Sequence, residues 1–451
     1  FAQFAQSDPT FLAKATVYAR TEGYMRLAPI TALVYLSMAE DKSPFKAIFD
    51  TVIRNAGDLS DFAYILESHQ IRGWGQTPKK AVQGWLKAHL SPYQAIKYRN
   101  EPPMPLRDIF RLAKPKYGAS NALVRWLVKE DTAGVPEMVA TFLAYKAASA
   151  KEKPAYIREG TLPFEAVIGD LPTTTAAWQA LLYNAPYMNM LRNLNNFEKY
   201  SVLDNMEDSA YLCKTLSDPE NVKRSMQFPF RFLTAVSAYT GNHQQVKEAI
   251  YDALELSVAH VPDLGRVLIA NDISGSMHSA VNGDSRIPIP CSMVAAIFAA
   301  AVFKQAADGE ITPFNDQLYS ANVSRRDSIM SIAKAIGRQA GGTNLSLPLQ
   351  YALQQTKPYD IAFFFTDNES WGDHLQGRGV LDEIRQYRQR FPKAKFIFVQ
   401  LMPYDKMQVP QDEPGVWYIY GWADTVLKHI ARIAQGDSQV QYVEGIDIFA
   451  K

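Results

Sequence analysis

Residues 267–277, Val-Leu-Ile-Ala-Asn-Asp-Ile-Ser-Gly-Ser-Met, decide the fold of the C-terminal part of the chain. The first four are apolar, which predicts a strand buried inside a parallel sheet. Asp272, Ser274 and Ser276 follow. One carboxylate and two hydroxyls, spaced two residues apart on a tight turn, can point at one spot. Such hard oxygen donors suit a divalent cation, Mg²⁺ first with Mn²⁺ or Ca²⁺ as alternatives, and they suit zinc poorly.

Two later segments add oxygen donors to this turn. Gly341-Gly342-Thr343 is expected on a loop before a helix over residues 345–355, and residues 360–367 are predicted to form a second buried strand ending in Asp367. In open parallel sheets ligands bind beyond the carboxyl ends of the strands, where we expect both aspartates. The pattern resembles the metal-ion-dependent adhesion site of von Willebrand factor A domains, Asp-x-Ser-x-Ser, a later Thr and a later Asp. That resemblance implies the metal ligands Asp272, Ser274, Ser276, Thr343 and Asp367. The alternative is an A-like domain whose metal site is vestigial.

The rest of residues 264–451 alternates helical and strand patterns. We expect a helix over 292–306, strands over 309–314 and 317–321, a helix over 382–390, strands over 395–401 and 416–420, and a last helix over 425–434. Alternation of this kind predicts an α/β doubly wound sheet with helices on both faces. Pro262 and Gly265 mark the boundary with the preceding part of the chain.

Residues 1–263 show amphipathic segments of helical length separated by short breakers. The predicted helices include residues 44–54, 58–68, 78–89, 106–113, 121–129, 136–150, 174–183, 187–199, 229–239 and 244–259. Helices of this length joined by short loops predict stacked helical hairpins in a solenoid-like array.

Composition excludes several classes of protein. The hydrophobic content of 47% and charged content of 21% are typical of a globular protein rather than a disordered one. Two cysteines give neither a disulfide framework nor zinc-ligand spacing. No apolar run reaches the ~18 residues of a membrane span, and no signal-peptide pattern is present. We therefore expect a cytoplasmic protein with no membrane partner.

The net charge of +1 conceals a basic block at residues 69–129, where twelve basic residues face two acidic ones, net +10. Candidate contacts to a polyanion are Arg72, Lys79, Lys80, Lys87, Arg99, Arg107, Arg111, Lys114 and Lys116. The block is interleaved with aromatic residues such as Trp74, Trp85 and Trp126, a composition that favours nucleic acid. Any single basic residue is more often part of a solvated helix face, and any single aromatic residue is more often part of a core.

Several stretches, in order along the chain, are similar to the Ro protein (TROVE) family. They are Gly73-Trp74-Gly75 followed by residues 79–82 and Trp85, residues 106–115, residues 191–194 (Leu-Arg-Asn-Leu), residues 341–348 and residues 365–369. The resemblance covers nearly the whole chain. It divides the chain into a TROVE helical-repeat module over residues 1–263 and a von Willebrand factor A domain over residues 264–451.

The resemblance implies a ring of HEAT-like helical repeats followed by the A domain, acting as a monomeric, nonenzymatic RNA-binding protein. It implies that small structured Y-like RNA binds on a basic outer face. It also implies that single-stranded 3′ ends of misfolded noncoding RNA enter the hole of the ring, in RNA quality control or processing. An exoribonuclease such as polynucleotide phosphorylase is the implied protein partner.

Two other functions stay open from the residues alone. The first is a protein–protein adaptor that binds an acidic partner through the metal site of the A domain. The second is a metal-dependent nuclease, which would need a positioned base or nucleophile beside the metal ligands. The basic block argues against a pure adaptor, and the small number of acidic residues near the metal turn argues against the nuclease.

Overall fold

The computed structural model describes residues 1–68, 74–116, 121–160, 162–227, 229–258, 264–281, 288–337, 341–367, 379–402, 407, 409–410, 412–421, 425–436 and 439–450. The chain forms two compact units. Unit 1 comprises Phe1–Asn189, Lys199–Val202 and Ser438–Lys451, and unit 2 comprises Met190–Glu198 and Leu203–Asp437. The boundary expected after residue 263 is the point where helices give way to the sheet. The compact units divide the chain differently. Unit 2 also contains helices before residue 263, and unit 1 also contains residues 438–451.

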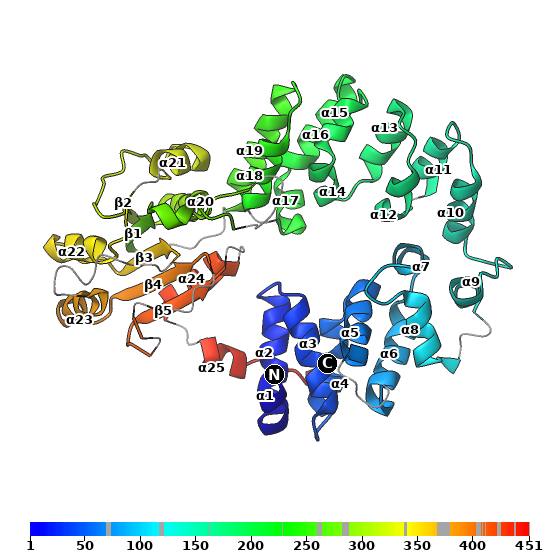
Figure 1. Ribbon diagram of the computed structural model, residues 1–451, viewed down its shortest axis with the longest axis horizontal. Coiled ribbons are helices and arrows are strands. Elements are labelled where there is room, and N and C mark those ends of the chain that lie inside the picture. The colour runs from blue at the N-terminus through cyan, green and yellow to red at the C-terminus, as the bar shows by residue number, and fades with distance from the viewer. Residues whose placement is uncertain are drawn as a thin grey trace. The chain divides into compact units, whose positions relative to one another are not determined.

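Unit 1 is a helical array, as the sequence predicts. Its helices are α1 (Ala2–Ser7), α2 (Pro9–Thr21), α3 (Leu27–Met38), α4 (Ser43–Val52), α5 (Ala56–Ser68), α6 (Gln76–His89), α7 (Pro92–Tyr98), α8 (Leu106–Ala113), α9 (Ala122–Lys129), α10 (Glu137–Ala147), α11 (Lys153–Gly160), α12 (Phe164–Val167) and α13 (Thr175–Asn184). Helices that follow one another in the sequence lie side by side within the unit, such as α2 with α3 and α8 with α9 (Figure 1). α25 (Gln439–Glu444) packs against α2, so the two ends of the chain build the same unit.

A buried ion cluster joins the first helices of unit 1. Asp58 on α5 has no exposed surface, and its carboxylate accepts hydrogen bonds from Arg20 of α2 at 2.5 Å and from Arg26 at 3.0 Å. Arg26 immediately precedes α3. A carboxylate away from water needs such partners, because the desolvation of an unpaired buried charge costs several kcal/mol. This cluster therefore fixes how three helices meet.

The segment expected to form one helix over residues 187–199 is broken in two, so that prediction is wrong in detail. α14 (Tyr187–Arg192) ends before Asn193, and α15 (Leu194–Lys199) begins after it. The carbonyl of Asn193 accepts from the backbone N–H groups of Asn196 and Phe197, and its side-chain oxygen accepts from the Asn196 amide at 2.9 Å. The N–H of Asn193 donates to the carbonyl of Met190, three residues back, at 3.2 Å, so the chain tightens where α14 ends and α15 starts.

Unit 2 joins four further helices to the sheet. The helices are α16 (Met206–Ser217), α17 (Pro219–Ser225), α18 (Pro229–Ala238) and α19 (Gln244–Ser257). The strands are β1 (Arg266–Asp272), β2 (Asp308–Phe314), β3 (Ile361–Thr366), β4 (Lys395–Gln400) and β5 (Val416–Tyr420). They form one parallel sheet in the order β2-β1-β3-β4-β5 (Figure 1).

Helices cover both faces of this sheet, as expected for a doubly wound fold. Alternate strand residues such as Leu268 and Phe364 share a core with α22 (Ser346–Gln354) and α23 (Val380–Arg390). On the other face, Phe365 of β3 stacks on Phe298 of α20 (Cys291–Gln305) at 6.3 Å between ring centroids. α21 (Ile329–Ile336) packs on α20, and α24 (Thr425–Gln435) packs beside β4 and β5.

The strand expected over residues 317–321 is absent, and that prediction is wrong. Leu318 forms only an isolated antiparallel bridge with Phe314, the last residue of β2. The chain reverses at once after β2, because the side chain of Asn315 accepts from the N–H of Gln317 at 2.8 Å. The N–H of Tyr319 then bonds back to the carbonyl of Pro313, but the pairing ends there and residues 319–321 form no strand. In the described part of the chain, no helix is long and apolar enough to cross a membrane.

Candidate functional site

The carboxyl ends of β1 and β3 form the crevice where a doubly wound sheet binds its ligands. β2 lies on one side of β1 and β3 lies on the other. The direction in which successive strands are added to the sheet therefore reverses between β1 and β3. Such a switch point opens a crevice beyond the strand ends. Asp272 is the last residue of β1, and Asp367 directly follows β3.

The turn after β1 is held by hydrogen bonds to the Asp272 carboxylate. Asp272 is fully buried, its Oδ1 accepts from the N–H of Ser274 at 2.9 Å, and its Oδ2 accepts from the Thr366 hydroxyl at 2.6 Å. The hydroxyl oxygens of Ser274 and Ser276 lie 3.2 Å apart. Three of the five predicted ligands therefore meet on one turn.

A backbone contact brings the predicted threonine loop to this turn. The N–H of Gly275 donates to the carbonyl of Gly341 at 3.1 Å. Gly341 has φ of +81°, a conformation that favours glycine. Thr343, two residues further along, is 4% exposed. The Gly-Gly-Thr sequence thus places its loop against the turn that follows β1.

The second aspartate follows the strand next to that of the first, since β1 and β3 pair in parallel with Asn271 opposite Phe365. Burial raises the pKa of Asp272 to about 7, and the negative charge of Asp367 adds to this rise against the hydrogen bonds from Ser274 and Thr366. Burial likewise raises the pKa of Cys291, at the start of α20, to about 12, and Asp367 contributes again. Two carboxylates buried near one another repel, and a divalent cation between them would remove that repulsion.

The donor set fits a hard cation. Among the described residues, no group of three or more histidine, cysteine or acidic side chains could hold a metal. A cation in this crevice would therefore take two carboxylates, Asp272 and Asp367, with hydroxyls from Ser274, Ser276 and Thr343. Thr366, which is not among the predicted ligands, donates to Asp272 from the end of β3. Its signal is the Thr-Asp pair that ends the second apolar strand.

In unit 1 the predicted basic block forms a surface on α6 and the end of α8. Lys80 and Lys87 lie seven residues apart, about two turns, and so share one face of α6. Between them, Gln83 donates to the carbonyl of Ala113 at 2.6 Å and so ties α6 to the C-terminal end of α8. The α6–α8 surface is defined here as Lys80, Lys87, Lys114 and Lys116, all exposed. Within the described part of the chain, none of the four forms an ion pair.

The other predicted RNA contacts are less available. The Arg99 guanidinium bonds to Glu130 at 2.8 Å and lies over the Trp126 ring at 4.8 Å. Arg111 pairs with Asp108 at 2.9 Å, and Arg107 lies 4.0 Å from the same carboxylate. These contacts neutralise part of the expected charge. Lys79 is half-buried, and Arg72 lies outside the described residues.

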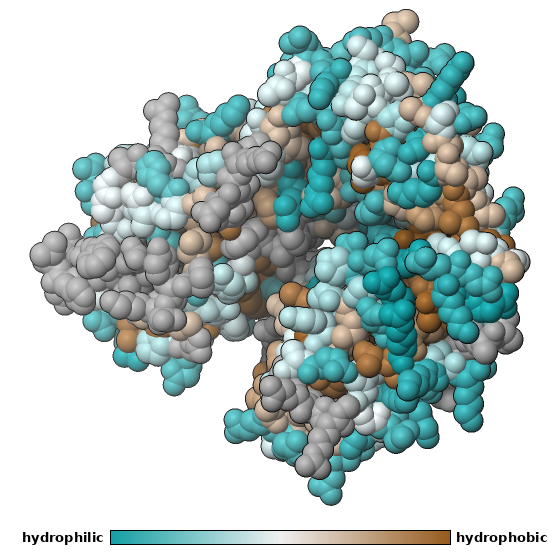
Figure 2. Space-filling model, turned by 45° about the vertical axis from the view of Figure 1, so that its right-hand side comes forward, coloured by the Kyte–Doolittle hydropathy of each residue, from teal (hydrophilic) through white to brown (hydrophobic). Residues whose placement is uncertain are grey.

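The tryptophans of the basic block belong to the core. Trp74, Trp85 and Trp126 are 7%, 2% and 1% exposed. The indole N–H of Trp85 donates to the carbonyl of Ile53 at 2.8 Å, and that of Trp74 donates to Glu67. These three rings are therefore not available for stacking on bases, in keeping with the core role expected for any single aromatic residue. On the face drawn in Figure 2, hydrophilic residues cover most of the described surface, and apolar residues show mainly between helices.

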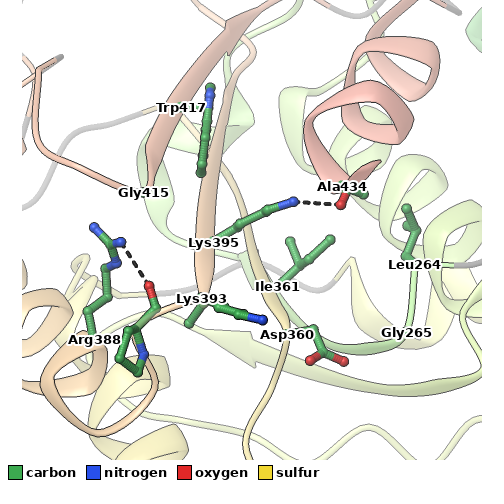
Figure 3. Close-up of a pocket in the computed structure, with 12 residues that line it drawn as sticks. Leu264, Gly265, Asp360, Ile361, Arg388, Lys393, Lys395, Gly415, Trp417 and Ala434 are labelled. Atoms are coloured by element: carbon green, nitrogen blue, oxygen red, sulfur yellow. Dashed lines mark hydrogen bonds between the residues drawn. The ribbon is translucent and has the colours of Figure 1, made fainter. Parts of the chain in front are cut away.

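A cavity of about 630 Å³ lies at the opposite edge of the sheet, at the amino ends of the strands (Figure 3). Two of the three cationic side chains that line it, Lys395 and Arg388, have structural partners. Lys395 donates to the carbonyl of Ile433 at 2.7 Å and to that of Ala434 at the C-terminal end of α24. Arg388 donates to the carbonyl of Pro392 at 2.9 Å. These bonds satisfy the last carbonyls of a helix and hold a loop, as capping cations do.

A helical array followed by a five-stranded parallel sheet with an Asp-x-Ser-x-Ser turn defines a helical-repeat protein with an A domain. Residues 164–271 match the TROVE domain family, and residues 266–434 match the family described as the Ro60 vWA domain. The chain carries both domains in the family's order and belongs to the Ro family.

Relatives agree with this assignment. The RNA-binding protein RO60 of Deinococcus radiodurans is 27% identical over 352 residues, 71% of this chain and 65% of that protein. The protein of the same name from Caenorhabditis elegans is 23% identical over 438 residues, 81% of this chain and 66% of that protein. The chain thus spans slightly less than two thirds of the length of each. The crystal structure of the Deinococcus radiodurans Ro (Rsr) protein shares the fold, with a TM-score of 0.77, 21% identity, and coverage of 97% of this chain and 93% of that one.

Proposed function

We propose that this protein binds RNA through the α6–α8 surface. The observation that carries the proposal is the set of four exposed lysines without ion-pair partners in the described part of the chain, gathered on one side of a helical array. Unpaired surface cations attract phosphates, and counterion release supplies the affinity. Both curated relatives are named RNA-binding proteins, which supports this class of ligand.

The family resemblance supports a finer form of the proposal. Small structured Y-like RNA binds on the basic face, since shape and backbone contacts dominate the recognition of double-stranded RNA. Single-stranded 3′ ends of misfolded noncoding RNA bind in the hole of a ring of helical repeats. The protein then acts in RNA quality control or processing in the cytoplasm, as a monomer, with an exoribonuclease such as polynucleotide phosphorylase as partner.

The crevice at β1 and β3 takes a divalent cation, Mg²⁺ first with Mn²⁺ or Ca²⁺ as alternatives. Asp272, Ser274, Ser276, Thr343 and Asp367 hold it, and Thr366 positions the first carboxylate. Three of the five donors are neutral hydroxyls, so the bound cation keeps positive charge and can accept a carboxylate from a partner protein. The crevice is therefore an adaptor site of the RNA-binding protein, and the protein carries out no reaction of its own.

The test compares two matched charge reversals in fluorescence anisotropy with a labelled RNA hairpin. Changing Lys80, Lys87, Lys114 and Lys116 to Glu should lower RNA affinity strongly and flatten its dependence on salt. Each phosphate contact contributes about −0.7 to −0.9 to the slope of log affinity against log salt, so the slope should change by about 3. The control reverses Lys214, Lys223, Lys334 and Lys393, which are exposed residues of unit 2. Equal losses in the two folded variants would contradict the assignment of the surface.

A further inference from the structure

The cavity of about 630 Å³ at the amino ends of the strands lies at the edge of the sheet opposite the cation crevice (Figure 3). Its volume is within the range of sites for small organic ligands, about 300–1,000 Å³. Leu264 and Ile361 line it and are 4% and 3% exposed, and the half-buried ring of Trp417 on β5 lines it as well. The cavity can therefore bury the apolar part of a small ligand.

One wall of the cavity is held by Arg388 of α23. Its guanidinium donates to the carbonyl of Pro392 at 2.9 Å and to that of Pro414, so it joins the chain before β4 to the chain before β5. This contact requires glycine at position 415, because a Cβ atom there would lie 2.6 Å from the guanidinium carbon. The wall is thus fixed before any ligand binds, which lowers the entropic cost of binding.

A carboxylate is fixed at the start of β3. Asp360 immediately precedes this strand, and its Oδ2 accepts from the N–H of Arg266 at 2.9 Å. A Cβ atom at Gly265 would lie 2.7 Å from the same oxygen, so glycine allows this close approach. Asp360 lines the cavity and is exposed, and no basic side chain among the described residues forms an ion pair with it. Its negative charge is therefore available to a ligand.

An ammonium group faces the same cavity. Lys393, on the loop between α23 and β4, is exposed and forms neither a hydrogen bond nor an ion pair with any described residue. Lys395 differs, because its ammonium bonds to the carbonyls of Ile433 and Ala434. Figure 3 shows the Lys393 side chain directed toward the part of the cavity where Asp360 lies. Two opposite charges thus border the cavity without pairing.

We infer that this cavity binds a free amino acid with a large apolar side chain. The carboxylate of the amino acid pairs with Lys393, its ammonium group pairs with Asp360, and its side chain packs on Ile361 and Trp417. A simple carboxylic acid would leave Asp360 facing it without a cation, and a simple amine would leave Lys393 without an anion. The site is independent of the proposed RNA binding and cation binding.

The experiment compares three ligands of the full chain by calorimetric titration in EDTA. L-phenylalanine carries both charges, 3-phenylpropanoate lacks the ammonium group, and 2-phenylethylamine lacks the carboxylate. Wild-type protein should bind phenylalanine about fivefold more tightly than either analogue, as expected for one partly exposed charge pair. Equal affinities for the three ligands would overturn the inference, as would no binding of phenylalanine. Binding that requires Mg²⁺ would also overturn it, because the ligand would then lie at the cation crevice.

Two substitutions separate the two charges. Lys393→Met should weaken phenylalanine binding about fivefold and leave the affinity for 2-phenylethylamine unchanged. Asp360→Asn should weaken phenylalanine binding to a similar degree without weakening 3-phenylpropanoate, and its amide oxygen can still accept from Arg266. Lys357→Met is the matched control, since Lys357 is exposed and does not line the cavity. An unchanged phenylalanine affinity in folded Lys393→Met protein would contradict the assignment.

The fluorescence of Trp417 reports where the ligand lies. Phenylalanine should change the tryptophan emission of wild-type protein, and this change should be lost in folded Trp417→Phe protein. A change that persists unaltered in Trp417→Phe would place the ligand elsewhere and overturn the inference.

Discussion

At the scale of single residues, Asp272 is a buried carboxylate at the proposed cation site. It ends β1, has no exposed surface and accepts hydrogen bonds on both oxygens. Its pKa is raised because water is excluded and because Asp367 is close. Folding thus places two like charges together at some cost, and a bound cation would offset that cost.

We predict that Asp272→Ala removes divalent-cation binding and leaves the fold intact. The side chain lies at the end of a strand rather than between packed layers, and its loss also relieves repulsion with Asp367. Calorimetric titration with Mg²⁺ and Mn²⁺ should give heats for wild-type protein and none for the variant. Asp382→Ala, an exposed acid at the start of α23, is the control and should titrate like wild type. Equal heats in Asp272→Ala and wild type would refute the ligand set.

At the scale of elements, polar contacts decide where helices begin and how they meet. Asn193 lies where one amphipathic segment divides into α14 and α15, and its side chain bonds to that of Asn196 in the first turn of α15. Asp58 joins α2, α5 and the start of α3 through Arg20 and Arg26. It also accepts from the backbone N–H of Arg54 at 3.1 Å. Apolar packing alone would leave the relative rotation of these helices less defined.

We predict that Asp58→Ala destabilises the protein by about 3–5 kcal/mol, the usual result of removing one partner of a buried ion pair. The change leaves the Arg20 guanidinium, whose pKa burial already lowers, without its carboxylate. Thermal unfolding followed by circular dichroism measures the effect. Asp50→Ala is the control, since that side chain is 70% exposed on α4 and should change stability little. A small effect in both variants would mean that apolar packing alone sets the helix geometry.

At the scale of the whole molecule, the proposed function gives the two units different ligands. We propose that the lysines of unit 1 bind a polyanion and that the crevice of unit 2 binds a cation, which could accept a carboxylate from a partner. The C-terminal segment returns to unit 1, where Tyr442 meets the ring of Tyr18 at 5.8 Å and Ile448 is buried in the core. The first and last helices therefore fold as one unit although they are far apart in sequence.

We predict that RNA with a single-stranded 3′ end binds better than the same hairpin with a blunt end, and that a 5′ tail helps less. The hole of the proposed ring would admit a single strand and exclude a duplex. Gel-shift with the three labelled hairpins, followed by denaturing electrophoresis in Mg²⁺, measures binding and integrity together. All three RNAs should remain uncut. Equal binding of blunt and tailed hairpins would argue against threading, and cleavage that disappears in Asp272→Ala protein would favour the nuclease.

Much of the fold follows from local patterns in the sequence. Apolar runs such as residues 267–270 and 361–365 can be buried only inside a covered sheet, so β1 and β3 were predictable. The order of Asp272, Thr343 and Asp367 along a parallel α/β pattern also predicts one crevice, since carboxyl ends of parallel strands share an edge. The break at Asn193 and the missing strand after β2 depend on local hydrogen bonds that hydropathy does not report.

Tertiary structure alone decided which groups are available for binding. In the sequence Arg99 and Lys80 are both simply positive charges. In the structure Arg99 bonds to Glu130 and lies over the Trp126 ring, whereas Lys80 is exposed on α6. The same holds for Trp85, whose ring is buried in the core and offers no exposed surface for stacking. Charge and residue type are properties of one position, and exposure and pairing depend on neighbours distant in the chain. For this reason the sequence determined the fold class and the cation ligands to be tested, while packing determined which charged and aromatic side chains are exposed.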